Sequence, residues 1–361
     1  MIFNTRLWMV TVLALLSVPL SGSEESRETL EKESRLSREE AVAALNGVVV
    51  PLITPVNEDL SLDGEGMRAL VDYLIGQGVH GLFPCSLTGR YKLFDREERR
   101  QLIATVVEAA AGRVPVFAGV DDETPELTIA QAKWAAGAGV DGVLVIPPGQ
   151  GQSVRSRREW RALREKLPAW QGEVLEFYQQ LHDAVDLFVI VHDRGGRGLE
   201  VQPETYAKLA EMPRVIGLKK SSTNVAPFPE IRQAIGERLA LSCGNEYVYL
   251  GALSMGCSGG VVGGGANVYP QLMLRLRERF LAGDLQGAFD YQTKINQAAR
   301  RFREVEGAKS LALQALGIPV KSFSRRDPAE EWRGSAKPAT ATELEKLQTY
   351  VRAIYKENSR Q

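Results

Sequence analysis

The chain has 361 residues, more than the roughly 250 of one α/β barrel, so it can bury a large apolar core. Its 44 lysines and arginines balance 45 aspartates and glutamates, and no long basic stripe occurs, which argues against nucleic acid and anionic membranes as partners. The three cysteines and three histidines are widely separated, so the sequence predicts neither a disulfide framework nor a metal site.

The first 23 residues have the pattern of a secretory signal peptide. Arg6 precedes an apolar run over residues 7–20, and the small residues 21–23 follow as a cleavage site. The run is short for a bilayer-spanning helix, and an uncleaved anchor or an overcalled start codon are the alternatives. We therefore expect an exported protein, periplasmic or secreted, without a stable membrane span after processing. Residues 24–45 carry mixed charges and are interpreted as a solvated linker or exposed helix.

From residue 46 onward, apolar strands alternate with amphipathic helices. The expected strands cover residues 47–54, 79–86, 114–120, 142–146, 186–192, 215–219, 239–244 and 259–262. The expected helices between them cover residues 63–77, 95–111, 126–138, 173–184, 203–211 and 225–235. These eight βα units predict a (β/α)8 TIM barrel over residues 46–268. A doubly wound open sheet is the competing fold, but it usually has a glycine-rich phosphate turn after its first strand, and the chain has none there.

Two segments depart from this alternation. Residues 150–172 connect a strand to a helix and exceed the usual two to six residues of a βα loop. We expect this insertion to be either a lid on the catalytic face or a surface excursion without a role. Residues 269–361 have helical composition and predict a C-terminal helical extension that packs on the barrel, with helices at 272–282, 285–304, 308–316 and 341–356.

The sixth expected strand ends at two consecutive lysines. Alternate residues of a barrel strand face the lumen, and Ile216 and Leu218 suit the face that packs on helices. Lys219 is therefore expected inside the barrel, on the same face as Val215 and Gly217. A lysine amine in a desolvated pocket loses proton affinity and can attack a carbonyl to form a Schiff base. A lysine paired with a carboxylate at the strand end is the structural alternative.

Polar residues follow the other strands at the edge where barrel active sites are built. The turn after the second strand has hydroxyls and backbone amides that can hold a carboxylate, although such turns are often only turns. His192 ends the fifth strand. Residues 263–265 are three glycines, which favour either a phosphate clamp or close backbone approach. The candidate substrate-binding residues are Ser86, Thr88, Gly89, Arg197 and Val261.

Together these segments resemble the dihydrodipicolinate synthase and N-acetylneuraminate lyase family of pyruvate-dependent class I aldolases, over about residues 47–298. The most specific matches are Val-Ile-Gly-Leu-Lys at 215–219, Pro-Glu-Thr at 203–205, Thr-Gly at 88–89 and Leu-Ser-Cys-Gly-Asn-Glu at 241–246. The resemblance implies that Lys219 is the Schiff-base lysine and that the chain forms a homo-oligomer. We expect no cofactor.

The carboxylate-binding turn of this family matches only in part. Thr88 falls on the second hydroxyl of the family's Gly-(Ser/Thr)-Thr-Gly-Glu turn, which binds the pyruvate carboxylate. Ser86 replaces its glycine, Leu87 its first hydroxyl and Arg90 its glutamate. Leu87 makes this wall apolar, which favours a neutral Lys219.

The family's proton relay is missing. In the stretch Tyr-Asn-x-Pro-x-Arg, Arg197 is kept but His192 replaces the catalytic tyrosine. The tyrosine pair that ends the fourth strand in the synthases corresponds to Pro148 and Gly149. An imidazole titrates near pH 6.5, so His192 can exchange protons at neutral pH, although a histidine that only caps the strand is the alternative.

The sequence predicts a class I lyase or aldolase that acts on pyruvate or a longer, sugar-acid-like 2-oxo acid. Lysine biosynthesis is doubtful, because the relay is absent and an export signal fits poorly with a cytosolic step. An exported barrel that binds a 2-oxo acid without turnover is the second hypothesis. A phosphate-handling barrel is the third.

Overall fold

The computed structural model describes residues 36–150, 157–194, 199–260, 263–304, 308–321 and 340–358. The expected signal peptide, Arg197 and Val261 lie outside these residues. Among the described helices, none combines the length and the apolar character needed to cross a bilayer.

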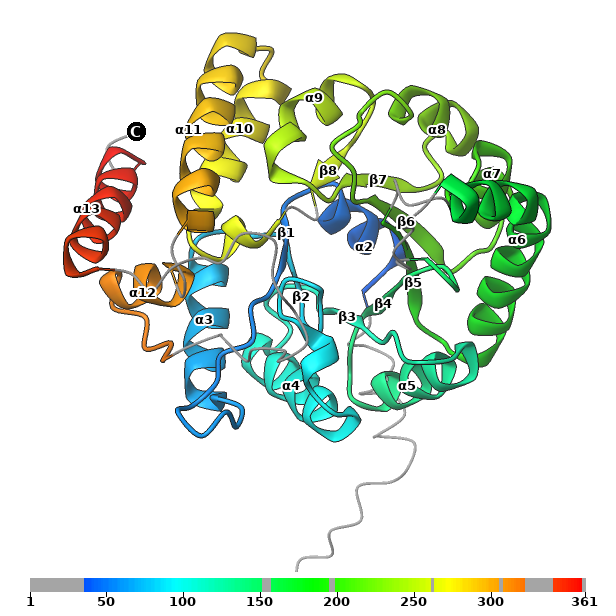
Figure 1. The fold of residues 1–361 in the computed structure, drawn as a ribbon, viewed down its shortest axis with the longest axis horizontal. Coiled ribbons are helices and arrows are strands. Elements are labelled where there is room, and N and C mark those ends of the chain that lie inside the picture. Colours follow the sequence, from blue (N-terminus) through cyan, green and yellow to red (C-terminus); the bar gives the residue numbers. More distant parts are fainter. Residues whose placement is uncertain are drawn as a thin grey trace, which may run out of the picture. The chain divides into compact units, whose positions relative to one another are not determined.

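Eight parallel strands form the predicted barrel (Figure 1). They are β1 (Val49–Pro51), β2 (Gly81–Phe83), β3 (Phe117–Gly119), β4 (Gly142–Val145), β5 (Phe188–Asp193), β6 (Val215–Lys220), β7 (Ala240–Cys243) and β8 (Gly259–Gly260). Strands β3 to β8 are hydrogen-bonded in sequence order, and β1 pairs with β2. Parallel bridges join Leu82 to Val116 and Val48 to Gly260, so the cylinder closes.

Helices surround the strands in the predicted order (Figure 1). They are α3 (Gly64–Gly76), α4 (Arg96–Ala110), α5 (Pro125–Gly137), α6 (Arg157–Ala184), α7 (Pro203–Leu209), α8 (Phe228–Ile235) and α9 (Tyr249–Ser254). Local chemistry fixes their starts: Asp95 and Glu98 form a capping box on α4, and Thr124 caps α5 with Pro125 at its first position. Helix α9 was not predicted, because six residues are too few to show a helical period.

The predicted C-terminal helical extension is also present. It comprises α10 (Pro270–Leu281), α11 (Leu285–Glu304), α12 (Ala308–Ala315) and α13 (Ala341–Asn358), which lie to one side of the helical ring in Figure 1. Two tyrosine hydroxyls converge on the carbonyl of Val268: Tyr73 of α3 donates at 3.0 Å and Tyr355 of α13 at 2.7 Å. This shared acceptor attaches the last helix to the barrel wall.

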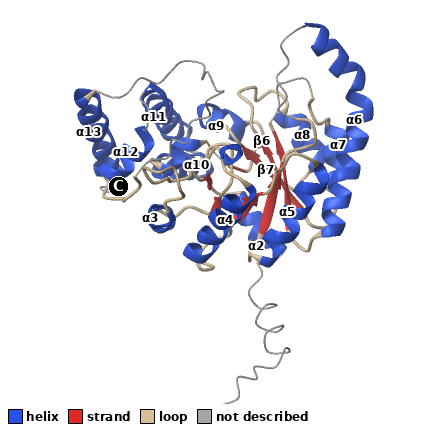
Figure 2. Ribbon diagram, turned by 60° about the horizontal axis from the view of Figure 1, so that its bottom comes forward, coloured by secondary structure: helices blue, strands red, loops and turns tan. Residues whose placement is uncertain are grey.

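Helix α2 (Arg38–Leu45) closes the end of the barrel where the strands begin (Figure 2). Ala41 and Leu45 are fully buried. The Arg38 guanidinium donates to the carbonyls of Pro213 and Arg238, which lie two residues before β6 and β7. Of the two interpretations of this segment, a solvated linker does not fit α2, whereas a helix does, although Ala41 and Leu45 are buried rather than exposed. Its buried face contains too few apolar residues to stand out within a charged segment.

Apolar side chains fill the lumen above α2. A β-bulge in β6 determines which residue of that strand is among them. They are Val49, Phe83, Phe117, Leu144, Ile190, Ile216 and Ala240. Val189 pairs with Val215, but Ile190 pairs with Gly217, so Ile216 is an extra residue in β6. Val215 consequently packs in the outer core and Ile216 in the lumen, the reverse of the prediction. Simple alternation cannot reveal a bulge.

We expect Leu45→Ala to lower the free energy of unfolding by about 3 kcal/mol, because it opens a void beneath the lumen cluster. Leu281→Ala, at a position 62% exposed, is the control and should change stability by less than about 0.5 kcal/mol. Urea unfolding of both variants measures the difference. Equal midpoints would show that α2 does not seal the barrel.

Helix α6 begins at Arg157, within the predicted insertion and well before the helix expected at 173–184. Pro168 lies inside it, which explains why the sequence suggested a loop there. The helix projects past the strand ends on the side away from α2 (Figure 2). Trp170 is buried, and its indole donates to the carbonyl of Pro148 at 2.7 Å. The described part of the insertion is therefore docked against the β4 loop.

Candidate active site

Lys219 lies near the end of β6 and is only 5% exposed. Its nitrogen lies 4.9 Å from the centroid of the Phe83 ring, which belongs to the lumen cluster. Within the described residues, the amine makes no hydrogen bond and no ion pair. Burial, helped by the positive charge of Arg194, lowers the pKa of Lys219 to about 7. The amine is thus substantially neutral, and hence nucleophilic, near neutral pH.

Space for the Lys219 side chain depends on Gly244, which follows β7. A Cβ atom at this position would lie 3.0 Å from Cε of Lys219 and 2.3 Å from Oγ of Ser221. A side chain at residue 244 would therefore displace Lys219 or Ser221. The glycine belongs to the Cys-Gly-Asn-Glu segment at the seventh strand end.

The neighbouring Lys220 has a different environment. Its ammonium forms a 2.7 Å ion pair with Asp193, and the two side chains are 3% and 0% exposed. Tyr206 also donates its hydroxyl to Asp193, and Gln150 donates its amide to the other carboxylate oxygen at 2.7 Å. Lys220 is therefore the lysine that pairs with a carboxylate at the strand end, whereas Lys219 is not.

His192 lies beside Lys219, because β5 and β6 pair these two residues in register. The imidazole is 2% exposed and meets the Phe83 ring edge-on at 6.2 Å between centroids. Its Nε2 lies 3.1 Å from the hydroxyl of Ser221, a contact that the sequence did not suggest. Burial, with the nearby charge of Lys219, lowers the pKa of His192 well below its usual value. His192 is therefore a neutral acid–base group at neutral pH.

The turn after β2 is held tightly. Ser86 Oγ accepts from the amide of Gly89 at 3.2 Å and donates to the carbonyl of Leu52 at 3.3 Å, so the Ser86 hydroxyl is used within the turn. A Cβ atom on Gly89 would lie 2.7 Å from both Leu52 O and Thr54 Oγ1, which explains the glycine. Thr88 is partly exposed, and its side chain makes no hydrogen bond within the described residues. Thr88 is thus the hydroxyl of this turn that remains available for a ligand.

Thr54, after β1, was not predicted as a site residue. Its hydroxyl is buried beside Gly89 and has no hydrogen-bond partner in the described part of the chain. A buried hydroxyl without a partner is costly unless a ligand or water satisfies it. The strand-end rule that identified Ser86 would also have identified Thr54.

The glycines at 263–265 lie against a carboxylate. A Cβ atom on Gly263 would lie 3.3 Å from the Glu246 carboxylate, and one on Gly265 would lie within 2.2 Å of Glu246 and Tyr269. Such short contacts favour close backbone packing at these glycines.

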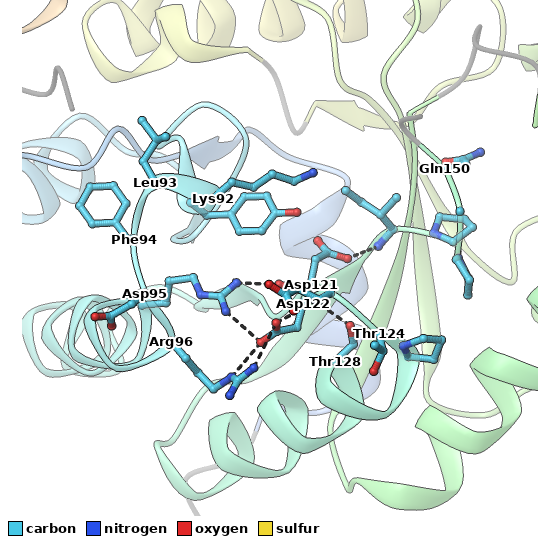
Figure 3. Close-up of a pocket in the computed structure, with 18 of the residues that line it drawn as sticks. Lys92, Leu93, Phe94, Asp95, Arg96, Asp121, Asp122, Thr124, Thr128 and Gln150 are labelled. Atoms are coloured by element: carbon cyan, nitrogen blue, oxygen red, sulfur yellow. Dashed lines mark hydrogen bonds and ion pairs between the residues drawn. The ribbon is translucent and has the colours of Figure 1, made fainter. Parts of the chain in front are cut away.

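A cavity of about 1200 Å³ opens beside the ends of β3, β4 and β5 (Figure 3). Lys219 and His192 do not line it, but Arg194, which follows His192, does. Asp121 lies on the same wall, with its Oδ1 accepting from the amide of Ile146 at 2.7 Å. Burial raises the pKa of Asp121 to about 7. This residue follows the third expected strand and was missed.

Comparison with known proteins decides the family. The sequence model of the dihydrodipicolinate synthetase family matches residues 44–152 and 167–347. The chain belongs to this family. The predicted family and the prediction of a lyase or aldolase are thereby confirmed. The stretch 153–166, between the two matched segments, falls within the predicted insertion.

Relatives and solved structures of the dihydrodipicolinate synthetase family agree with this result. A 4-hydroxy-tetrahydrodipicolinate synthase of Methanoculleus marisnigri is 32% identical over 67% of this chain and 78% of its own length. A DapA-like lyase of Halobacterium salinarum, itself uncharacterized, is 32% identical over 76% of this chain and 84% of its own. The dihydrodipicolinate synthase of Bacteroides thetaiotaomicron superposes with a TM-score of 0.71 at 26% identity, covering 86% of this chain and 98% of its own.

Proposed function

We propose that this chain is an imine-forming lyase whose Lys219 attacks the carbonyl of pyruvate or a longer 2-oxo acid. The observation that carries the proposal is the state of Lys219: its amine is buried, unpaired within the described residues and depressed in pKa to about 7. A lysine kept only for structure would have a carboxylate partner, as Lys220 has in Asp193.

The chemistry follows from the arrangement of side chains. The neutral Lys219 amine attacks the 2-oxo carbon, and loss of water gives an iminium. Thr88 and the amides of its turn bind the substrate carboxylate. In a longer acid with a hydroxyl at C4, that hydroxyl loses its proton, the C3–C4 bond breaks to release an aldehyde, and its electron pair passes to the iminium, giving an enamine. The enamine is then protonated and hydrolysed to release the 2-oxo acid. His192, neutral and next to Lys219, transfers the protons.

Borohydride reduction in the presence of pyruvate tests the proposal. The reduced adduct should add the mass of the pyruvate-derived group to the peptide that contains Lys219, as read by peptide mass spectrometry. Wild-type protein without a mass increment on that peptide would end the proposal.

The rate of adduct formation should rise with pH, reach half its maximum near pH 7 and then level off. Lys219 has a pKa of about 7 in the fold, so the nucleophilic neutral form is depleted below this value and predominates above it. Free lysine, titrating near pH 10.4, is the control and should continue to gain reactivity to about pH 10. A profile for the protein that follows free lysine would contradict the depressed pKa.

His192→Phe should leave the trapped adduct intact but slow proton exchange at the pyruvate methyl group about 100-fold, because general acid–base groups contribute about 10²–10⁴-fold. Exchange is followed by NMR in D₂O. His182→Phe, which alters a histidine at the end of α6, is the matched control. Unchanged exchange in His192→Phe would make this histidine a strand cap only.

A barrel that binds a 2-oxo acid without turnover remains the second candidate, because the family's relay hydroxyls are absent. It predicts that 2-oxo acid affinity is unchanged in Lys219→Ala, whereas an imine-dependent enzyme loses the imine contribution to its affinity and all of its activity. We also propose export of the mature protein, since residues 7–20 have the pattern of a signal peptide. N-terminal sequencing of protein from the extracytoplasmic fraction tests this point, and a chain that still begins at Met1 would refute cleavage.

A further inference from the structure

The cavity beside β3, β4 and β5 is larger than a three-carbon acid requires. Its volume is about 1200 Å³, above the roughly 300–1,000 Å³ of pockets that hold drug-sized ligands. Arg194 lines this cavity and lies two residues after His192, directly beyond the end of β5, and its charge also lowers the pKa of Lys219. The cavity therefore adjoins the proposed imine site and can accommodate a substrate chain that extends from it.

Asp121 lies where its carboxylate can contact such a substrate chain. One carboxylate oxygen is fixed by the amide of Ile146, and Figure 3 shows the side chain directed into the cavity. Within the described residues, the other oxygen accepts no hydrogen bond. The negative charge of Asp121 raises the pKa of Lys219, so the two groups are electrostatic neighbours.

The charges of the cavity indicate the kind of group that fits. Five basic and five acidic side chains line it, so the lining has no net charge to attract a second carboxylate or an ammonium. Two of the cations, Arg96 and Arg99, are already paired with Asp122 at 3.0 and 2.9 Å. A hydroxyl suits Asp121 best, because it can donate to a carboxylate and accept from a carboxylic acid.

We propose that the open oxygen of Asp121 binds a hydroxyl on the substrate chain beyond the 2-oxo acid group, so that Asp121 selects hydroxylated 2-oxo acids. This inference rests on the proposed function for the position of the 2-oxo acid group. It assigns to Asp121 a role in specificity, separate from the proton transfers of His192.

The test compares two six-carbon acids, 2-oxohexanoate and a 3-deoxy-2-oxohexonate, which differ only in hydroxyl groups. Affinities are measured by calorimetry in a Lys219→Met background, where the ligand cannot be consumed. We expect the hydroxylated acid to bind at least tenfold more tightly, because only this acid can form a hydrogen bond with the Asp121 side chain. Asp121→Ala and Asp121→Leu should reduce this ratio to about 1, and Asp121→Asn should retain most of it.

Glu123→Ala is the matched control, since Glu123 lines the same cavity but is exposed. It should leave the ratio unchanged. A ratio near 1 without any substitution at residue 121, a ratio that survives in both Asp121→Ala and Asp121→Leu, or an equal loss in Glu123→Ala would each overturn the assignment. Thermal unfolding confirms that the variants are folded.

Borohydride trapping with pyruvate, in protein that retains Lys219, separates the two proposals. Asp121→Ala should trap pyruvate like wild type, because pyruvate has no hydroxyl to bind. Failure to trap pyruvate in the wild type would reject the imine-forming function while the calorimetric ratio still decides the role of Asp121. Loss of trapping in Asp121→Ala alone would overturn the specificity role.

Discussion

Lys219→Met should abolish the borohydride-trapped pyruvate adduct and reduce any lyase activity at least 1000-fold. Methionine fills a similar volume but has no amine, so no covalent intermediate can form. Peptide mass spectrometry and a coupled pyruvate assay measure the two effects. Lys92→Met, which removes an exposed amine beside the same strand ends, is the control and should trap pyruvate normally. Persistence of the adduct in Lys219→Met would place the nucleophile elsewhere.

The same variant should be no less stable than wild type. The Lys219 pKa is about 7 in the fold and near 10.4 in the unfolded chain, so the unfolded state binds the extra proton between these values. Wild-type stability should therefore rise with pH across this window, because folding no longer requires the amine to give up its proton. Lys219→Met should lack this component of the pH dependence.

Lys220→Met should instead destabilise the protein by about 3–5 kcal/mol. It leaves Asp193 buried without its cation, and removal of one partner of a buried ion pair is expensive. Urea unfolding at neutral pH measures the loss. Lys219→Met is the matched control, because it changes the adjacent residue in the same way but breaks no ion pair.

A second substitution separates the ion pair from simple packing. Adding Asp193→Leu to Lys220→Met should recover part of the loss, because the uncompensated charge is then removed. Additive losses in the double variant would mean that the two side chains act independently, contrary to the 2.7 Å contact between them.

The sequence was sufficient to predict the barrel and the position of Lys219, because both depend on short-range periodicity and on the rule that barrel sites form at strand ends. It did not show which acidic residue pairs with Lys220. The partner of Lys220 is Asp193, which lies 27 positions earlier in the chain and is brought close only when β5 and β6 pair. Contacts of this kind leave no local signal.

Other misses have equally physical causes. Helix α2 looked like a linker because its first three residues, Arg38, Glu39 and Glu40, continue the charged segment before it, and only a narrow face is buried. Asp121 was overlooked because its strand end lacked a family motif, although position alone would have nominated it. The exchange of faces between Val215 and Ile216 came from the bulge, which restores the expected alternation from Gly217 onward.

That single extra residue determines which amine of the pair becomes chemically reactive. Lys219 and Lys220 have the same side chain and adjacent positions, yet one meets an aromatic ring in the lumen and the other a carboxylate behind the sheet. A regular register continued from Val189 and Val215 would instead bring Lys219 opposite Asp193 and exchange the two environments. The reactivity of a lysine in such a strand therefore depends on the spacing of the residues before it as well as on its own identity.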